Sequence, residues 1–209
     1  MKIAFIGAGN MATGLGKHWA AKGHELFFSH SRDQDKLKKH AASVNAMAKV
    51  GTADEAAKFA DVLILVTPYD ASPVAIKAAG DLKGKLFWSI VNPLKADYSG
   101  LQVGTTTSGA EELAKLAPES RFVAALPPFA EVLHRDRLPD PAPSVFVYSN
   151  DEEARRTVHG LVTDLGAEAV DAGPLYAARF FEPAMMGLVY LAYGQKMGGG
   201  IGLRLLNNN

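Results

Sequence analysis

Apolar and polar positions alternate along this chain in blocks that predict strands and helices in turn. Short, nearly continuous apolar runs of strand length occupy residues 2–6, 25–29, 61–67, 85–91, 122–126, 145–149 and 168–170. Such runs are typical of strands buried on both faces, as in a parallel sheet covered by helices. A further strand, with the weakest signal, is expected within residues 43–50. The pattern predicts an α/β fold with a doubly wound, mainly parallel sheet.

The segments between these runs carry helix start signals. Thr52-Ala-Asp-Glu55 and Ser108-Gly-Ala-Glu111 have the spacing of capping boxes, and Asn150-Asp-Glu-Glu precedes a helical stretch that stops at Gly166. Residues 127–143 break this rhythm because they contain five prolines. Long ordered loops in compact domains often bind ligands, so we expect this connection to contribute to a site.

The pattern changes again from residue 174 onward. A predicted apolar helix spans about residues 175–193 and is followed by three glycines at 198–200. Its large side chains, Met185, Met186, Leu188, Val189, Tyr190 and Leu191, cover too much of the circumference for a surface helix. We therefore expect it to pack against the sheet, against a second subunit, or against both.

The first strand runs directly into a glycine-rich turn and a helix. Gly7 permits a tight turn, Gly9 lets the backbone approach a pyrophosphate, and the small Ala12 lets helix and strand pack closely. The free N–H groups and the dipole of the helix N-terminus favour phosphate binding. The turn predicts a dinucleotide site with Gly7, Gly9, Asn10 and Met11 at the phosphates; a merely tight strand-to-helix turn is the alternative.

The end of the second strand indicates which dinucleotide binds. An acidic residue there would bind the ribose hydroxyls of NAD, but this chain has Ser31 and Arg32, with Lys36 one helical turn further on. Arginine binds phosphate through paired charge-assisted hydrogen bonds. These residues favour NADP, and an exposed Ser-Arg pair in a loop is the alternative.

Composition narrows the function classes. The chain has 209 residues, 48% of them hydrophobic, and its 22 basic residues equal its 22 acidic ones. This balance provides no global field for nucleic acid or an anionic membrane, so neither is an expected partner. The absence of cysteine excludes disulfides and thiolate chemistry and fits a cytoplasmic protein. No residue spacing suggests a metal site, and none suggests a catalytic nucleophile.

In a parallel sheet the ligand lies beyond the carboxyl ends of the strands. Three of these ends carry proline, which cannot continue a central strand: Thr67-Pro68-Tyr69, Asn92-Pro93 and Leu126-Pro127-Pro128-Phe129. We expect Tyr69 on the adenosine side, Asn92 at the nicotinamide ribose, and residues 126–129 at the acceptor. No acid/base pair is evident, which fits hydride transfer between two stacked rings, where alignment and exclusion of water are the main requirements.

Together these residues resemble the coenzyme F420-dependent NADP oxidoreductase family, and the cytoplasmic domains of STEAP-type metalloreductases look like relatives. The most specific match is Asp171-Ala172-Gly173-Pro174-Leu175, followed by Arg179 and Glu182. The resemblance implies 2′-phosphate contacts at Ser31, Arg32 and Lys36 and a nicotinamide-side loop at Asn92-Pro93. One departure concerns the acceptor, because the family typically has a His-Thr or Phe-Asn-Thr sequence where this chain has Pro127-Pro128-Phe129.

The expected function is hydride transfer between NADP and a deazaflavin, coenzyme F420, or a flavin such as FMN or FAD. We expect a Rossmann-type NADP-binding domain at residues 1–173. A helical segment at 174–209 would complete the acceptor site and the contact of a homodimer. Two alternatives remain: reduction of a small imine or carbonyl substrate, and a non-catalytic NADP-binding sensor or assembly module.

Overall fold

A computed structural model describes residues 1–29 and 34–206, apart from the side chains of Gln34 and Lys36. Within these residues, eight strands form one sheet with the order β3-β2-β1-β4-β5-β6-β7-β8. The strands are β1 (Lys2–Ile6), β2 (Glu25–Ser29), β3 (Lys49–Gly51), β4 (Val62–Leu65), β5 (Leu86–Ser89), β6 (Arg121–Ala125), β7 (Ser144–Tyr148) and β8 (Glu168–Asp171). Each expected strand is present, and β3 begins at the far end of the interval that the sequence left open, 43–50, and ends one residue beyond it.

Eight α-helices connect and cover these strands in the described residues. They are α1 (Asn10–Ala21), α2 (Gln34–Val44), α3 (Ala53–Phe59), α4 (Ser72–Ala78), α5 (Gly109–Lys115), α6 (Ala130–Leu133), α7 (Glu152–Asp164) and α8 (Ala178–Val189). Short 3₁₀ turns at Tyr69–Ala71 and Leu175–Ala177 precede α4 and α8, and a π-helical turn at Tyr190–Gly194 follows α8. The predicted C-terminal helix is therefore present as three consecutive helical pieces.

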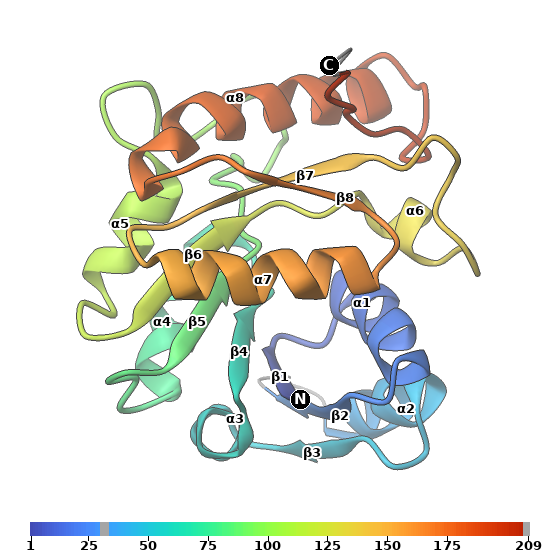
Figure 1. The fold of residues 1–209 in the computed structure, drawn as a ribbon, viewed down its shortest axis with the longest axis vertical. Coiled ribbons are helices and arrows are strands. Elements are labelled where there is room, and N and C mark those ends of the chain that lie inside the picture. Colours follow the sequence, from blue (N-terminus) through green and yellow to red (C-terminus); the bar gives the residue numbers. More distant parts are fainter. Residues whose placement is uncertain (30–33, 207–209) are drawn as a thin grey trace.

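The helices form one layer on each face of the sheet (Figure 1). On one face, α1, α2 and α7 bury a core that contains Trp19, Trp88 and Phe28. On the other face, α3, α4 and α5 pack with the start of α8 around Phe87 and Tyr148. Both faces of the central strands are buried, which explains why their sequences are apolar without alternation. The fold is the expected Rossmann-type doubly wound sheet.

One strand reverses the direction of the sheet. The pairs from β3 to β6 are all parallel, but β7 is antiparallel to β6, and β8 is parallel to β7. The proline-rich connection after β6 contains only the four-residue α6, so the chain does not cross back over the sheet before β7 begins. The last residues of β6 pair with the last residues of β7, Ala124 with Tyr148 and Ala125 with Val147, so the start of β7 extends past the end of β6 toward the expected acceptor loop.

The predicted helix starts are confirmed, but one of the two capping boxes differs in its side-chain contacts. Thr52 forms the full capping box with Glu55 at the start of α3. Ser108 accepts a hydrogen bond from the N–H of Glu111 at 3.1 Å, but the carboxylate of Glu111 binds Arg179. A carboxylate engaged by an arginine from α8 is a tertiary contact that helix spacing alone does not reveal.

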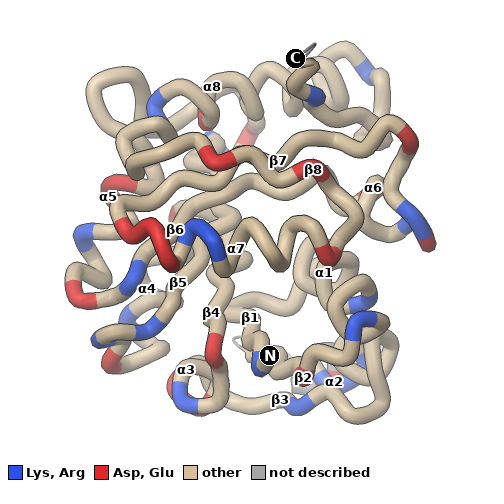
Figure 2. The backbone as a smooth tube through the Cα atoms, viewed as in Figure 1, with Lys and Arg blue, Asp and Glu red and all other residues tan. Residues whose placement is uncertain are grey.

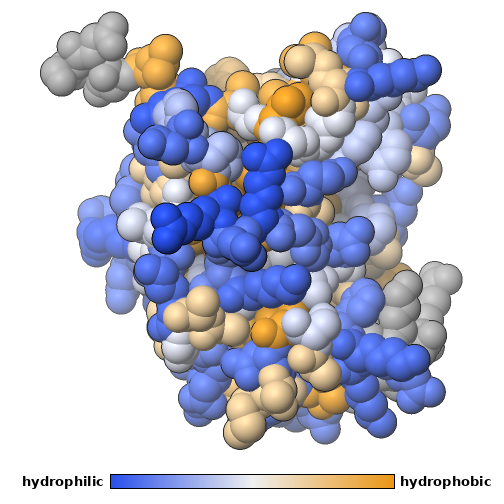
Figure 3. Space-filling model, turned by 90° about the vertical axis from the view of Figure 1, so that its right-hand side faces the viewer, coloured by the Kyte–Doolittle hydropathy of each residue, from blue (hydrophilic) through white to orange (hydrophobic). Residues whose placement is uncertain are grey.

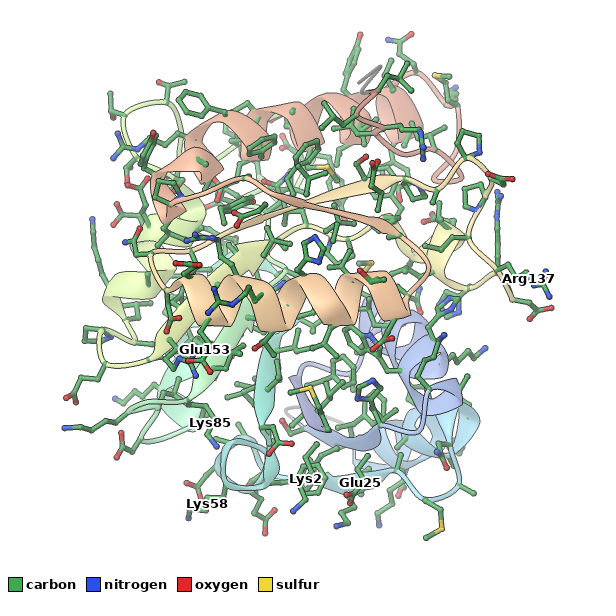
Figure 4. The ribbon with its side chains drawn as sticks, viewed as in Figure 1. Lys2, Glu25, Lys58, Lys85, Arg137 and Glu153 are labelled. Carbon is green, nitrogen blue, oxygen red and sulfur yellow. The ribbon has the colours of Figure 1, made fainter. Side chains whose placement is uncertain are left out.

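The two ends of the sheet differ in polarity. Lys2, Glu25 and Lys85 lie at the start of a strand or just before one, at the lower end of the molecule (Figure 4). The opposite ends of β1, β4, β5 and β6 lead into the glycine- and proline-containing loops of the predicted site. Among the described helices, none is long and apolar enough to cross a lipid bilayer.

Candidate functional site

A cavity of about 530 Å³ lies at the carboxyl ends of β1, β4, β5 and β6. Its lining combines the predicted strand-end residues with two side chains of α8: Gly9, Met11, Val66, Thr67, Pro68, Tyr69, Asp70, Ile90, Val91, Asn92, Leu94, Lys95, Ala96, Tyr98, Leu126, Pro127, Phe129, Met185 and Val189. This volume is within the range of small-molecule sites, and the lining is mostly apolar. The charged side chains among these residues are those of Asp70 and Lys95.

The turn at one edge of the cavity contains two glycines, Gly7 and Gly9, which serve different purposes. Gly7 has φ of +112°, and a Cβ atom added there would lie 2.3 Å from the carbonyl oxygen of Val66. A Cβ added to Gly9 would meet nothing within 4 Å. Gly7 is therefore required by the fold itself, whereas Gly9 keeps a space open beside the N-terminus of α1, which suits the close approach of a pyrophosphate.

The helix N-terminus at this turn is available for a phosphate. Gly9 is the N-cap of α1, and no side chain of the described residues caps this helix. Asn10 is its first residue and Met11, the next one, lines the cavity. A side chain from α2 fixes the turn from outside, because Nδ1 of His40 lies 2.6 Å from the carbonyl oxygen of Ala8. The geometry fits a dinucleotide phosphate site.

Three residues are predicted to contact the 2′-phosphate. Ser31 and Arg32 lie outside the described residues, as does the side chain of Lys36. Their role in selecting NADP stays a prediction from the sequence.

The Thr67-Pro68-Tyr69 turn is held by a small hydrogen-bond network. The hydroxyl groups of Thr67 and Ser72 lie 3.0 Å apart, and Ser72 donates to the carbonyl oxygen of Pro68 at 3.1 Å. Tyr69 begins the 3₁₀ turn and is half-buried. Burial, followed by nearby carboxylates such as Glu112, raises the pKa of the Tyr69 phenol, so this ring stays neutral at physiological pH.

Asn92 joins the strand ends to the C-terminal helix. Its side-chain N–H group donates to the backbone carbonyl oxygen of Glu182 over 3.5 Å. Its side-chain oxygen is buried without a hydrogen-bond partner among the described residues. An unpaired acceptor on a cavity-lining side chain fits the recognition of a polar ligand group, such as the ribose hydroxyl or carboxamide at the nicotinamide end of a dinucleotide.

The neighbouring Pro93 has a packing role. It is buried against the start of α5, where a Cβ added to Gly109 would lie 2.8 Å from atoms of the proline ring. Pro93 does not line the cavity, so among the predicted nicotinamide-side residues only Asn92 reaches it.

The predicted acceptor loop is divided between two cavities. Leu126, Pro127 and Phe129 line the main cavity. Pro128 instead faces a separate, smaller cavity on the side of the C-terminal segment that contains Ile201 and Leu203. Pro128 is therefore buried against the chain's own tail and not in the predicted acceptor wall.

Two aromatic side chains of the cavity lining, Phe129 and Tyr98, both lie beside the ring of Tyr193, which does not itself line the cavity. The ring centroids of Phe129 and Tyr193 are 5.8 Å apart, and those of Tyr193 and Tyr98 are 6.1 Å apart. The hydroxyl of Tyr193 donates to Glu131 at 3.1 Å. Burial and the Glu131 carboxylate raise the pKa of Tyr193 to about 12, which keeps it neutral. Together, Tyr98, Phe129 and Tyr193 form what we call the aromatic mouth.

The C-terminal helix α8 supplies the remaining wall of the cavity. Met185 and Val189 line the cavity. One helical turn away, Glu182 is 1% exposed, and its two carboxylate oxygens accept hydrogen bonds from the N–H groups of Gly109 and Ala110, each at 2.8 Å. Arg179 binds both oxygens of Glu111 at 2.7 and 2.8 Å. These four hydrogen bonds fasten α8 to the first turn of α5.

The burial of Glu182 has an electrostatic consequence. Removal from water raises its pKa to about 7, although its two backbone hydrogen bonds act in the opposite direction. The carboxyl group therefore changes charge near neutral pH. Arg179 and Glu182, which carried the family resemblance, have a structural role here because both position α8.

Sequence reasoning missed part of the lining. Lys95 and Tyr98 lie in the loop after β5, where no periodicity or turn motif singles them out. Tyr98 has a positive φ of 57°, which tyrosine rarely adopts and which a sequence pattern does not reveal. The apolar run of the C-terminal helix indicated burial, but it did not reveal that Met185 and Val189 face a ligand cavity.

Comparison with known families gives a match over the part of the chain that contains the glycine turn and two of the strand ends. Residues 2–93 match the model of a family described as NADP oxidoreductase, coenzyme F420-dependent. This match includes the glycine turn and both Thr67-Pro68-Tyr69 and Asn92-Pro93. A search of curated proteins found no significant match.

Solved structures extend the similarity to the whole chain. A candidate F420-dependent NADP-reductase from Arthrobacter sp. FB24 is 25% identical, with a TM-score of 0.86 over 99% of this chain and 100% of that one. A hypothetical protein from Sinorhizobium meliloti is 26% identical, with a TM-score of 0.76 over 85% of this chain and 87% of that one.

A third similar structure shares the fold alone. An imine reductase from Aspergillus terreus, solved with NADPH4 and dibenz[c,e]azepine, is 17% identical with a TM-score of 0.67. The match covers 93% of this chain but 62% of the Aspergillus enzyme, which is therefore the longer protein.

Proposed function

We propose that this protein catalyses hydride transfer between NADP and a planar tricyclic acceptor, as expected from the match of residues 2–93 to the model of the coenzyme F420-dependent NADP oxidoreductase family. The acceptor is a deazaflavin, coenzyme F420, or less efficiently a flavin. The observation that carries the proposal is the apolar cavity of about 530 Å³ at the ends of β1, β4, β5 and β6, with Phe129 and Tyr98 of the aromatic mouth in its lining.

The residues divide the proposed site into two halves. The turn at Gly9 and the N-terminus of α1 hold the phosphates, and the side chain of Asn92 holds the nicotinamide end. When bound, NADPH supplies a hydride from its nicotinamide ring to the acceptor ring, which takes up one proton from water. Phe129 and Tyr98, which lie beside Tyr193, pack against the acceptor and keep water away from the two rings.

The chemistry of the predicted acceptor loop favours a ring acceptor over a ketone or imine. Reduction of a carbonyl or imine is assisted by a proton donor beside the reacting atom. Next to the aromatic mouth, Leu126 and Pro127 have apolar side chains, and proline has no backbone N–H group to donate. A stacked ring acceptor needs neither a side-chain nor a backbone proton donor, because alignment of the two rings provides most of the rate enhancement.

An acceptor panel tests this function directly. Purified protein is mixed with NADPH and with coenzyme F420, FMN, FAD, riboflavin, a cyclic imine or a simple ketone, and the loss of absorbance at the NADPH band is followed by stopped flow. Turnover should be fastest with F420, slower with the flavins and negligible with imine and ketone. Turnover with imine alone would replace the proposal by the imine reductase alternative. Tight NADPH binding without turnover would indicate a sensor.

Cofactor preference is a separate expectation that rests on Ser31, Arg32 and Lys36. A lost hydrogen bond to a charged group costs about 1.5–3 kcal/mol, so Arg32→Ala should weaken NADPH binding about 10- to 150-fold. Binding of NADH, which lacks the 2′-phosphate, should be almost unchanged. Titration calorimetry with both nucleotides measures the ratio of their dissociation constants. Equal losses of affinity for NADPH and NADH would contradict the assignment.

A further inference from the structure

A basic side chain, that of Lys95, lies in the lining of the main cavity. Lys95 and Asp70 are the charged residues of a lining that is otherwise neutral. The surface seen in Figure 3 is largely hydrophilic, whereas the cavity is lined mostly by apolar side chains. Figure 2 shows basic and acidic residues interspersed over the tube, with α8 tan over most of its length. The charge of Lys95 is therefore a local feature of the cavity and not part of a basic face.

The backbone around Lys95 is held in a short hairpin of residues 94–102, which we call the cavity hairpin. Leu94 and Leu101 form an antiparallel bridge. The backbone N–H of Lys95 donates to the carbonyl oxygen of Gly100 at 2.9 Å. These contacts fix a loop that carries several residues of the lining, so the fold itself sets the position of Lys95 on the cavity.

Tyr98, in the same hairpin, has a backbone conformation that points to a ligand. Its φ is +57°, in the left-handed region that tyrosine rarely adopts. Its N–H donates to the carbonyl oxygen of Lys95 at 2.9 Å, which closes the turn between the two residues. Residues held in such conformations cluster at active sites and ligand clamps. The turn presents a flat aromatic ring and a positive charge, three residues apart, to one cavity.

The nearest acidic residue in the sequence is used by the turn itself. The carboxylate of Asp97 accepts the backbone N–H of Ser99 at 3.0 Å. Hydrogen bonds with Ser99 are the main reason that the pKa of Asp97 lies below its usual value, and the charge of Lys95 is the smallest contribution. No carboxylate of the described residues forms an ion pair with Lys95. Within that part of the chain, its ammonium group is available to an anion.

We propose that Lys95 binds a phosphate on the side chain of the ring acceptor and so selects phosphorylated acceptors over unphosphorylated ones. This role rests on the proposed hydride transfer to a ring acceptor. Lysine binds phosphate as a compact point charge, without the fixed geometry of arginine. Tyr98 packs on the ring, and Lys95 takes the charged group at the end of the chain attached to that ring.

The position of the cavity hairpin favours the acceptor over the dinucleotide as the source of the phosphate. The predicted phosphate turn at Gly9 follows β1, and the predicted 2′-phosphate contacts follow β2. The hairpin follows β5, which is separated from β1 by β4 in the sheet. It comes directly after Asn92-Pro93, where the nicotinamide end is predicted. A phosphate beside Lys95 is thus on the acceptor side of the proposed site.

FMN and riboflavin test this role because they differ only in the terminal phosphate. Their dissociation constants are measured by flavin fluorescence at low ionic strength with NADP⁺ bound. Lys95 is exposed, so wild type should bind FMN about fivefold more tightly than riboflavin, as for a strong exposed ion pair, and high salt should reduce this ratio. In Lys95→Gln the ratio should fall close to one, whereas Lys95→Arg, which keeps the charge, should retain most of it.

Lys77→Gln is the matched control for loss of charge. Lys77 is also exposed, but it lies on α4 and does not line the main cavity, so its variant should keep the wild-type ratio. NADPH affinity, measured on the same proteins, separates the two sources of phosphate, because Lys95→Gln should leave it almost unchanged. A loss of affinity in Lys95→Gln that is larger for NADPH than for FMN would overturn the proposal and assign Lys95 to the dinucleotide.

Failure of this role and failure of the proposed function give different results. Turnover with ring acceptors, together with the same FMN-to-riboflavin ratio in wild type and Lys95→Gln, would overturn the role of Lys95 alone. A ratio that depends on Lys95, without turnover, would support the phosphate contact and contradict hydride transfer. If neither flavin binds, the same comparison is made with coenzyme F420 and its riboflavin-like core without phosphate. Absence of binding in both pairs would overturn the role of Lys95 together with the proposed function.

Discussion

The two walls of the cavity are held in place by different kinds of contact. The wall built from strand ends continues the backbone hydrogen bonding of the sheet: the N–H of Gly7 donates to Ser29, that of Val66 to Ile6 and that of Ile90 to Leu65. The wall built from α8 is fastened to α5 by the side chains of Arg179 and Glu182. The first wall follows from the local chain path, whereas the second depends on tertiary contacts, both these hydrogen bonds across some 70 residues of sequence and the stacking of Phe181 on Phe146 and Tyr148.

This difference has a functional meaning under the proposed activity. The strand-end wall carries the predicted NADP contacts, and α8 carries two side chains that face the acceptor. The half of the site predicted to bind the dinucleotide is thus the half held by backbone hydrogen bonds of the sheet. The acceptor half includes α8, which the buried carboxyl group of Glu182 helps to hold against α5.

Substitution of Gly7 breaks the first wall and should have the largest effect. Gly7→Ala forces a side chain into a backbone conformation with φ of +112° and places Cβ against the Val66 carbonyl. Strain and overpacking of this kind lower the free energy of unfolding by about 2–4 kcal/mol. Urea denaturation measures this loss.

Gly9→Ala is the matched control for the same turn. Its added Cβ meets nothing, so the free energy of unfolding should stay within about 0.5 kcal/mol of wild type, while NADPH affinity falls because the phosphate loses space. If both variants unfold at the same urea concentration, the distinction between the two glycines is wrong.

A change of pH loosens the second wall through Glu182. The carboxyl group has a pKa of about 7 when folded and an ordinary pKa of 4.5 when exposed, so the folded state binds more protons between these two values. The free energy of unfolding should therefore fall as pH rises from about 5 to 7, by about 2 kcal/mol from this group, and then level off.

Glu182→Gln removes the titrating group and should abolish that part of the pH dependence. Comparing urea midpoints of the two proteins at pH 5, 6, 7 and 8 isolates the contribution of Glu182, because all other groups are shared. Parallel curves for wild type and variant would show that Glu182 does not titrate in this range.

Asn92 links the two walls and should give the smallest of these effects. Asn92→Ala removes a long hydrogen bond to the Glu182 carbonyl and the predicted contact to the nicotinamide end. A neutral hydrogen bond contributes about 1 kcal/mol, so KM for NADPH should rise about fivefold, with little change in the urea midpoint. A loss of stability without any change in KM would make Asn92 a purely structural residue.

The wall built from strand ends could be predicted from the sequence. The Gly7-to-Ala12 turn and the three proline-bearing strand ends are local patterns, and parallel topology brings strand ends to one edge of the sheet. The same logic failed for Pro93 and Pro128, because which side of a loop meets the cavity depends on the neighbours against which it packs. Pro93 is buried against Gly109 and Pro128 against the C-terminal tail.

The second wall was predictable only as a helix. Apolar periodicity indicated α8 and its burial, but it did not indicate that Glu182 would accept hydrogen bonds from Gly109 and Ala110. That pairing joins residues 73 and 72 positions apart, and no local pattern encodes it. The direction of β7 was missed for a related reason, since proline content predicts a loop and does not predict where the loop ends.

Isotope transfer tests the central claim most directly, which is that the two rings meet in this cavity. NADPH carrying deuterium at the transferred position of the nicotinamide is incubated with coenzyme F420 and the protein, and the reduced deazaflavin is analysed by mass spectrometry. Direct transfer predicts one deuterium on the ring carbon of the product. In the reverse experiment, with unlabelled NADPH in heavy water, that ring carbon should acquire no deuterium. Reduced product without the label, or no reduced product at all, would contradict the account.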